Sequence, residues 1–466
     1  MREVDRRSFL GMAAATTGGF LGLQGAVAAN LLGFDDAARG YGGLAEDPEG
    51  ILDLPAGFSY RTISRWGEEM DDGLLVPHEH DGMAAFDGGP GRTILVRNHE
   101  IGVDADLAWG AFGPRLERLP LVDRSRFFDA GSGDRPVLGG TTTVVYDQRT
   151  GTVEKHFLSL AGTGRNCAGG PTPWKSWISC EEWTQKADEL CAKDHGWCFE
   201  VPATDQPGLA DPRPLRGLGR FNHEAIAVAP DGRCVYLTED RNDGLLYRFV
   251  PERPGRLAEG GRLQALAVAG KPSIDLRNWI DPATETPTVA PAVRLPVEWI
   301  DLEGADSPDD DLRFRGLSAG AARLARGEGM WTGRDEILFA CTSGGVARIG
   351  QIWKYRPSPA EGFEGESEAP GTLELLIEAT EGGVIENADN LTIAPWGDVF
   401  VCEDGPPGNG LVRVTPKGRV DRFALNRLSG SELAGACFSP DGRTLFVNIQ
   451  HQGITVAIEG PWRSPA

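Results

Sequence analysis

The most regular feature of the chain is a short apolar run, a tight turn and a second apolar run that ends in polar groups. Residues 222–240, NHEAIAVAPDGRCVYLTED, show it in full, with a Pro-Asp-Gly turn between the two apolar runs. Proline presets φ and glycine accepts a positive φ, so this turn is well suited to join two strands. A tight turn brings the outer ends of two antiparallel strands together. The pattern therefore predicts a β-hairpin that carries Glu224 and Glu239 at one end.

The same pattern recurs along the chain. In four copies the polar group before the first run and the polar group after the second are 13 to 15 residues apart. About six such hairpins favour an all-β fold, a six-bladed β-propeller whose polar ends face the central channel at one mouth. We expect residues 255–311, which are rich in proline and weak in periodicity, to form a loop excursion over one face. The hairpins occupy residues 80–100, 166–183, 222–240, 327–345, 386–405 and 430–452.

Composition limits the classes of partner. The chain has 466 residues, of which 63 are glycine and 32 are proline, and this suits a globular fold with many tight turns. Its formal net charge of -22 argues against nucleic acid or an anionic membrane as a partner. We expect a small-molecule substrate and a monomer.

The N-terminal residues have the features of an export signal. Arg6 and Arg7 precede Ser-Phe-Leu and an apolar run rich in glycine and alanine, and the segment Ala26-Val27-Ala28 fits a cleavage site. We therefore predict a twin-arginine signal peptide at residues 1–28 and a single β-propeller domain at residues 29–466. The protein would be periplasmic or secreted, with the twin-arginine translocase as its partner during export and without stable membrane insertion.

The repeated hairpins gather many carboxylates at one mouth. Carboxylates held close together repel and raise one another's pKa, and multivalent cations relieve that repulsion. Calcium prefers carboxylate and amide oxygens, whereas the thiol of Cys167, in the polar loop GTGRNCAGG, indicates a transition metal. A solvated acidic rim is the alternative. Asn387 is among the asparagines that add neutral oxygens at the mouth. The carboxylates that the alignment of hairpins places there are Glu100, Glu181, Glu182, Glu224, Glu239, Asp240, Glu328, Asp389, Glu403 and Asp404.

Three further residue types bear on the chemistry. Among eight cysteines, Cys191 and Cys198 lie in a polar loop and form the candidate disulfide pair. The motif Asn-His-Glu lacks the second histidine of a zinc HExxH site, so we expect His223 to form hydrogen bonds rather than to bind metal. Arg326 lies two residues before Glu328. It could bind an anionic substrate or form a salt bridge with a carboxylate.

Together these motifs resemble the PhoX-type alkaline phosphatase family. The resemblance rests on the twin-arginine leader, NCAGG with the later CEEW, FNHEA, RGEG and ENADNLTIAPWGDVFVCEDG, which span most of the chain in order. It implies a six-bladed β-propeller with a cluster of ferric iron and calcium ions that acts on phosphate monoesters.

The resemblance also implies roles for individual residues. Cys167, Glu224 and Glu328 correspond to iron ligands, and Arg326 corresponds to an arginine that stabilises the phosphate in the transition state. Two other functions stay open on the same scaffold, a calcium-dependent lactonase or esterase and a non-catalytic propeller braced by metal. The implied calcium ligands are Glu181, Glu182, Asn387, Asp389, Glu403 and Asp404.

Overall fold

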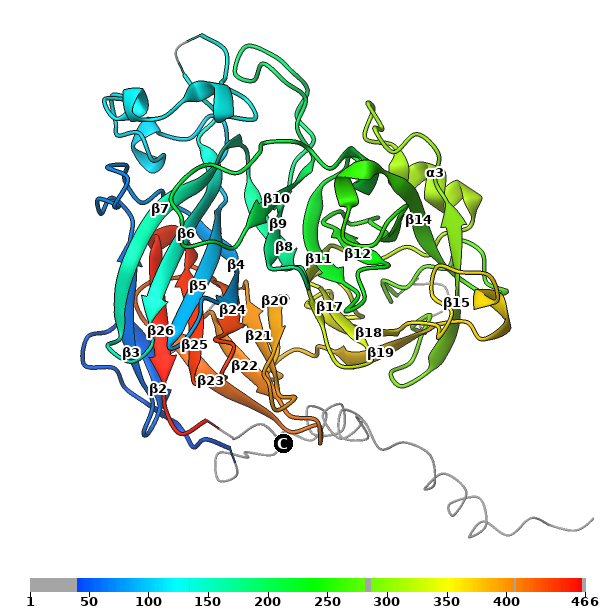
Figure 1. Ribbon diagram of the computed structural model, residues 1–466. Helices are drawn as coiled ribbons and strands as arrows, with labels where there is room; N and C mark the ends of the chain where they lie inside the picture. The colour runs from blue at the N-terminus through cyan, green and yellow to red at the C-terminus, as the bar shows by residue number, and fades with distance from the viewer. Residues whose placement is uncertain (1–39, 134, 281–285, 406–407, 463–466) are drawn as a thin grey trace, which may run out of the picture.

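The computed structural model describes residues 40–133, 135–280, 286–405 and 408–462 (Figure 1). The predicted signal peptide lies outside these ranges. The described chain is all-β apart from short helices, and its sheets have a propeller-like arrangement. Within the described ranges the structure has one α-helix, α3 (Leu312–Ala319), and none of its helices is long and apolar enough to cross a membrane. Single turns of 3-10 helix are η1 (Leu107–Trp109), η2 (Leu119–Leu121), η3 (Arg124–Arg126), η4 (Arg216–Leu218), η5 (Leu257–Glu259), η6 (Glu366–Glu368) and η7 (Gln450–Gln452).

The strands of the described chain form five sheets. Two sheets from the first half of the chain are β4 (His80–Asp87), β5 (Arg92–His99), β6 (Gly139–Asp147) and β7 (Thr152–Thr163), and β8 (Asn166–Pro171), β9 (Ser176–Glu181) and β10 (Cys198–Pro202). The largest sheet runs in the order β11 (His223–Val228), β12 (Val235–Glu239), β13 (Leu246–Pro251), β14 (Gly261–Val268), β15 (Arg294–Asp301), β19 (Thr372–Glu378), β18 (Gln351–Arg356), β17 (Ile337–Cys341) and β16 (Gly327–Thr332).

The other two sheets combine strands from both ends of the chain. One runs in the order β1 (Leu44–Ala45), β2 (Leu52–Pro55), β23 (Val420–Asn426), β22 (Gly410–Val414), β21 (Val399–Glu403) and β20 (Ala388–Ile393). The other is β24 (Leu433–Phe438), β25 (Thr444–Ile449), β26 (Ile454–Glu459) and β3 (Ser59–Arg65). Because β3 pairs with β26, the N-terminal and C-terminal parts of the chain share one sheet.

The six predicted hairpins are confirmed. Each quoted segment forms an antiparallel pair of strands, namely β4–β5, β8–β9, β11–β12, β16–β17, β20–β21 and β24–β25. Their first strands contact one another in chain order, and β24 contacts β4, so these strands form a closed ring. The ring brings the starts of six distant segments to one centre.

The prediction for residues 255–311 is wrong in part. This segment contains β14 and β15, and β15 pairs with both β14 and β19, so it joins the two halves of the nine-stranded sheet. Buried and exposed residues alternate at the start of β15, as expected for a strand covered on one face. The many prolines in the segment hid this alternation in the sequence.

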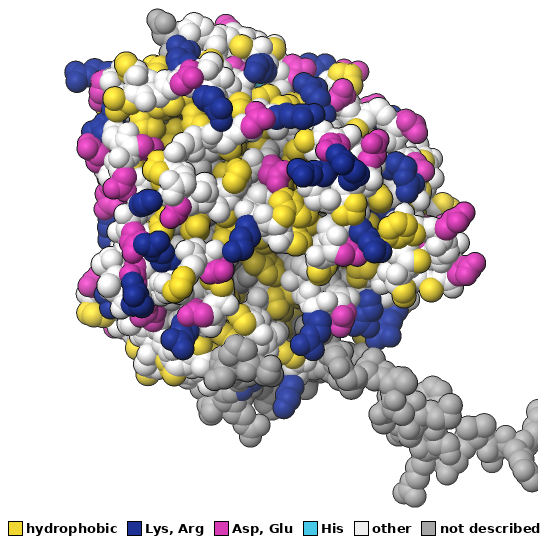
Figure 2. Space-filling model, viewed as in Figure 1, with side chains coloured by type: hydrophobic (Ala, Val, Ile, Leu, Met, Phe, Trp, Pro, Cys, Tyr) yellow, Lys and Arg dark blue, Asp and Glu magenta, His cyan; other side chains and the backbone are white. Residues whose placement is uncertain are grey.

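Apolar side chains fill the space within and between the sheets, and charged side chains cover the outside. On the face shown in Figure 2, acidic and basic side chains are interspersed, so this face has no single acidic patch. Among the described residues, many of the buried carboxylates lie instead at the centre of the ring of first strands.

Candidate metal centre

Each of the six hairpins has a β-bulge near the start of its first strand. Two residues of the first strand lie opposite one residue of the second strand. A bulge aims a side chain away from the regular ladder and is common beside active sites. The first bulge residues of the six hairpins are Asp81, Cys167, Glu224, Glu328, Asp389 and Gly435. Five of the six bulges therefore carry a side chain that can bind a metal ion.

The sixth bulge has glycine for a steric reason. Gly435 has φ +62, and a Cβ atom there would lie 2.4 Å from the backbone oxygen of Asp81. Glu432, just before β24, brings a carboxylate to the centre from this hairpin instead.

The bulge side chains, together with Glu100 and Glu182, form three overlapping groups of possible ligands. In each group the ligand atoms lie within 4.8 Å of one another. Consecutive groups share Cys167 or Glu224, so they form one continuous cluster. The groups are Asp81, Glu100 and Cys167; Cys167, Glu182 and Glu224; and Glu224, Glu328 and Asp389.

A cavity of about 440 Å³ lies at this cluster, and we refer to it as the central cavity. Carboxylates dominate its lining, with three arginines and one tryptophan among them. The residues that line it are Glu100, Arg165, Cys167, Glu182, Trp183, Asn222, Asp240, Arg241, Arg326, Glu328, Asp389, Asp404 and Glu432.

The cluster is electrostatically unfavourable without bound cations. Burial raises the pKa of Glu224 well above its usual range, and the charges of Asp389 and Asp81 raise it further. Burial and the neighbouring carboxylates likewise raise the pKa of Glu328 and of the Cys167 thiol. Neither carboxylate oxygen of Glu224 has a hydrogen-bond partner among the described residues. Buried unpaired oxygens beside a thiol and further carboxylates fit a site for multivalent cations.

At the ends of three of the second strands are two successive acidic residues, and the two side chains point to opposite faces of the sheet. Glu182, Asp240 and Asp404 line the central cavity, whereas Glu181, Glu239 and Glu403 do not. Successive side chains of a strand point to opposite faces, and this alternation separates the two members of each pair.

Two residues that the sequence analysis grouped with the site therefore lie in other contacts. Glu403 forms an ion pair with Arg422 at 2.7 Å. Glu181 accepts hydrogen bonds from the backbone N–H groups of Gly164 and Gly196 and contacts His195. Asn387 also lies outside the cavity lining, and its carbonyl accepts a hydrogen bond from the N–H of Asp404.

Two arginines enter the central cavity from equivalent positions. Arg165 and Arg326 each come immediately before the first strand of a hairpin, and both have a positive φ, of 46° and 50°. Such a backbone conformation is uncommon for a residue other than glycine and is often found at functional sites. Arg165 was missed in the sequence, although its place before Asn166 matches that of Arg326 before Gly327.

Both arginines are held by carboxylates of the cavity. Arg326 pairs with Asp240 at 2.7 Å and with Glu328 at 2.8 Å, and Arg165 pairs with Glu100 at 2.6 Å and Glu182 at 2.9 Å. Burial alone would lower the pKa of Arg326, but the surrounding carboxylates outweigh it and raise that pKa. Of the two roles that the sequence leaves open for Arg326, the salt bridge with a carboxylate is therefore present.

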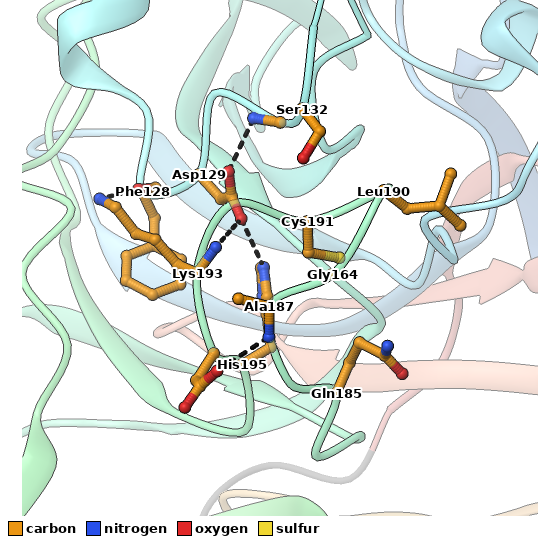
Figure 3. A network of polar contacts seen from close by, with 12 residues as sticks. Phe128, Asp129, Ser132, Gly164, Gln185, Ala187, Leu190, Cys191, Lys193 and His195 are labelled. Atoms are coloured by element: carbon orange, nitrogen blue, oxygen red, sulfur yellow. Dashed lines mark hydrogen bonds and ion pairs between the residues drawn. The ribbon is translucent and has the colours of Figure 1, made fainter.

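A buried ion-pair network is centred on His195 (Figure 3). The ring of His195 packs against that of Trp183, which lines the central cavity. His195 contacts Glu181 through Nδ1 at 2.6 Å and Asp129 through Nε2 at 3.2 Å, and all three side chains are fully buried. Burial alone would lower the pKa of His195, but the two carboxylates raise it to about 11, so the ring is an imidazolium. Residues 182–197, which begin with Glu182 and Trp183, are thereby fixed to the sheet.

The predicted disulfide between Cys191 and Cys198 is wrong. Cys191 lies beside Asp129 and His195, whereas Cys198 lies opposite Cys180 in the pairing of β9 with β10. All eight cysteines are free thiols in the structure. The polar composition of the loop hid the fact that Cys198 already belongs to a buried strand.

A comparison with protein families matches this chain to the family described as alkaline phosphatase PhoX. The match covers residues 39–151 and 134–453. A comparison with curated protein sequences found no match.

Among solved structures, the chain is similar to Pseudomonas fluorescens PhoX in complex with vanadate, a transition state analogue. The two are 19% identical with a TM-score of 0.64, over 88% of this chain and 96% of that one. A gluconolactonase from Xanthomonas campestris is 12% identical with a TM-score of 0.40, over 91% of this chain and 99% of that one. Virginiamycin B lyase from Staphylococcus aureus is 10% identical with a TM-score of 0.36, over 86% and 99%.

Proposed function

The chain belongs to the alkaline phosphatase PhoX family, and from this premise we propose that it hydrolyses phosphate monoesters at the central cavity with bound iron and calcium. The observation that carries the proposal is the convergence of five bulge side chains, one of them a thiol, beside two arginines. Carboxylates alone would suit calcium, and the thiol adds a ligand that suits a transition metal.

We assign the ligands by their chemistry. Cys167, Glu224 and Glu328 would hold ferric iron, because the thiol and the unpaired oxygens of Glu224 lie in one group. Glu182, Asp389 and Asp404 would hold calcium through oxygen atoms at the cavity wall. When bound, these cations would supply Lewis acidity and positive charge for the phosphoryl group and its attacking oxygen.

The arginines have the geometry to bind the phosphoryl oxygens. Asp240 and Glu328 hold the guanidinium of Arg326 at the cavity, so little side-chain freedom remains to be lost on binding. A guanidinium fixed in this way stabilises the negative charge that develops on the oxygens in the transition state. Arg165, which precedes hairpin β8–β9, would contact the same group, and Trp183 lines the cavity beside them.

The solved relative supports this assignment. Pseudomonas fluorescens PhoX binds vanadate, which is described as a transition state analogue, and this chain shares its fold. We propose that the central cavity of this chain binds the phosphoryl group in the same part of the fold.

We further infer that the fold has six blades. The nine-stranded sheet would count as two blades, β11–β14 and β16–β19, which β15 joins at their outer edges. The closed order of contacts among the six first strands supports this count. We also propose that residues 1–28 direct export through the twin-arginine pathway to the periplasm or beyond, and that the mature protein is a monomer.

The test is hydrolysis of p-nitrophenyl phosphate and of a simple lactone by the purified protein. We expect phosphate release, and we expect Arg326→Gln to lower kcat/KM by roughly 10²–10³-fold, as for the loss of one transition-state donor. The matched control is Arg253→Gln, because Arg253 is an exposed arginine outside the cavity lining. Turnover of the lactone without phosphate release would favour the lactonase, and turnover of neither would favour the non-catalytic propeller.

A further inference from the structure

A second group of metal-ligand type lies between two sheets. Cys180 of β9, Cys198 of β10 and His223 of β11 place their ligand atoms within 4.8 Å of one another, and all three are fully buried. None of them lines the central cavity. We propose that this group binds a thiophilic cation of the zinc class, separate from the metal ions of the central cavity.

The two sulfur atoms are spaced for one metal ion. Cys180 and Cys198 lie directly opposite each other in the pairing of β9 with β10, with their Sγ atoms 3.7 Å apart. A tetrahedral zinc ion binds sulfur at about 2.3 Å, which places two sulfur ligands about 3.8 Å apart. The strand pairing therefore already holds the sulfurs at the spacing that the ion requires.

The sequence led us to expect His223 only as a hydrogen-bonding residue, but its hydrogen bond holds it in the tautomer that can also bind a metal. Its Nε2 lies 3.0 Å from the carbonyl oxygen of Gly219, and a carbonyl only accepts, so Nε2 carries the proton and donates it. Nδ1 is then the nitrogen with a free lone pair. Among the residues that the structure describes, none forms a hydrogen bond with this buried atom. A backbone carbonyl that fixes the tautomer is the usual outer partner of a metal-binding histidine.

The charge of the complex suits its surroundings. Phe221, Leu218 and Ile178 are among the buried apolar residues around the two cysteines. Two thiolates and a neutral imidazole balance a divalent cation, so the bound group would be neutral in an apolar core. Three protein ligands are the number found in zinc sites whose fourth ligand is a water molecule.

The network of Asp129, Cys191 and His195 provides a contrast. There the two nitrogens of His195 contact the carboxylates of Glu181 and Asp129, and both carboxylates accept further hydrogen bonds from backbone N–H groups. An ion-pair network accounts for that group without a metal. Paired thiols would account for Cys180 and Cys198, but they would leave Nδ1 of His223 buried without a partner.

The site would tie the three-stranded sheet to its neighbour. Cys180 and Cys198 belong to β9 and β10, whereas His223 begins β11 of the nine-stranded sheet. Cys180 directly precedes Glu181, which belongs to the His195 network. His223 directly precedes Glu224, which belongs to the central cluster. A cation here would therefore fix the separation of two elements that build the central cavity.

The test uses the full mature protein loaded with Co²⁺ as a spectroscopic substitute for Zn²⁺. Cys167→Ser first removes the thiol of the central cluster. In this background we expect thiolate-to-cobalt charge-transfer absorption that corresponds to about one equivalent of thiolate-bound Co²⁺ and is lost when Zn²⁺ displaces the cobalt. The additional change Cys198→Ser should abolish the absorption, and Cys234→Ser is the matched control, because Cys234 is another buried cysteine outside these ligand groups.

The spectrum of the Cys167→Ser protein decides the matter even if Cys198→Ser does not fold. Absence of thiolate-to-cobalt absorption in it would overturn the proposal. So would an intact mass two hydrogens lower, which would show that Cys180 and Cys198 form a disulfide. Because phosphatase activity is not the readout, failure of this site and failure of the proposed function are distinguishable.

Discussion

Glu224 of the central cluster lies in an unfavourable electrostatic environment. It is fully buried, its two oxygens have no hydrogen-bond partner among the described residues, and Asp389 and Asp81 raise its pKa beyond the effect of burial. A residue in this environment destabilises the metal-free protein and is favourable only beside a cation.

We therefore predict opposite effects of Glu224→Gln on stability and activity. Loss of one repelling carboxyl should raise the melting temperature of the chelator-treated protein, and the loss of a proposed iron ligand should lower kcat by at least about 10²-fold. Thermal melts in chelator and initial rates with p-nitrophenyl phosphate measure both effects. If the variant is as active as the wild-type protein, Glu224 is not a metal ligand.

We predict that His195 stabilises the fold and that its contribution to the free energy of unfolding depends on pH. Removal of one partner of a buried ion-pair network costs about 3–5 kcal/mol, so His195→Gln should lower the free energy of unfolding by that order near neutral pH. The pKa of His195 is raised to about 11 in the folded state. Its contribution is therefore full below about pH 6.5, its unfolded pKa, and is lost as the pH rises toward 11.

Urea unfolding at pH 6, 8 and 10 checks this prediction. The difference between the wild-type protein and His195→Gln should shrink with each step. A difference that stays constant over this range would mean that His195 is neutral in the folded protein.

Among elements, strand β8 depends on its glycines for close packing. A Cβ atom on Gly170 would lie 2.0 Å from the backbone oxygen of Ile226 in β11, so any side chain would force these neighbouring strands apart. The motif NCAGG thus joins the proposed metal-ligand thiol to Gly169, which lets β8 lie close to Ile178 of β9, and to Gly170, which lets β8 approach β11. The glycines fix the position of Cys167 relative to Glu224.

Gly170→Ala should therefore destabilise the protein by about 1–3 kcal/mol, the usual range for overpacking. The matched control is Gly430→Ala, since a Cβ atom on Gly430 would meet nothing within 4 Å. Chemical denaturation of both variants measures the effect. If the two variants unfold alike, the close approach of β8 and β11 is not tight in solution.

The hairpins were predictable because the residues of their turns specify a chain reversal without help from the rest of the fold. Pro-Asp-Gly and Pro-Trp-Gly-Asp specify a reversal from local sequence alone, and all six hairpins are present. The direction in which each side chain points at the strand ends was harder to predict from the sequence. Alternation places Glu181 and Glu182 on opposite faces, but which face turns toward the central cavity depends on the packing of the sheets, so the sequence could not separate the two.

Long-range partners were also hidden from the sequence. Arg165 and Asp81 follow the hairpin pattern, but a single sequence gives no reason to prefer them over other charged residues nearby. The pairing of Cys198 with Cys180 and the insertion of β15 between β14 and β19 depend on tertiary contacts.

For the whole molecule, the net charge of -22 and the acidic cluster would couple the proposed metal binding to folding. Ligands that bind only the folded state stabilise it, by about 2.7 kcal/mol at a hundredfold excess over Kd. We predict that chelation lowers the melting temperature by several degrees and that added Ca²⁺ restores part of the loss. Calorimetry in chelator and after addition of calcium measures this. An unchanged melting temperature would mean that the carboxylates bind no structurally important cation.

The most direct test of the central claim is the metal content of the protein after export and purification under native conditions, measured by ICP-MS. We predict iron and calcium together, each in more than single equivalents, and loss of iron with retention of the fold in Cys167→Ser. Calcium without iron, or iron that persists at full amount in Cys167→Ser, would contradict the assignment of an iron-binding thiol in the central cavity.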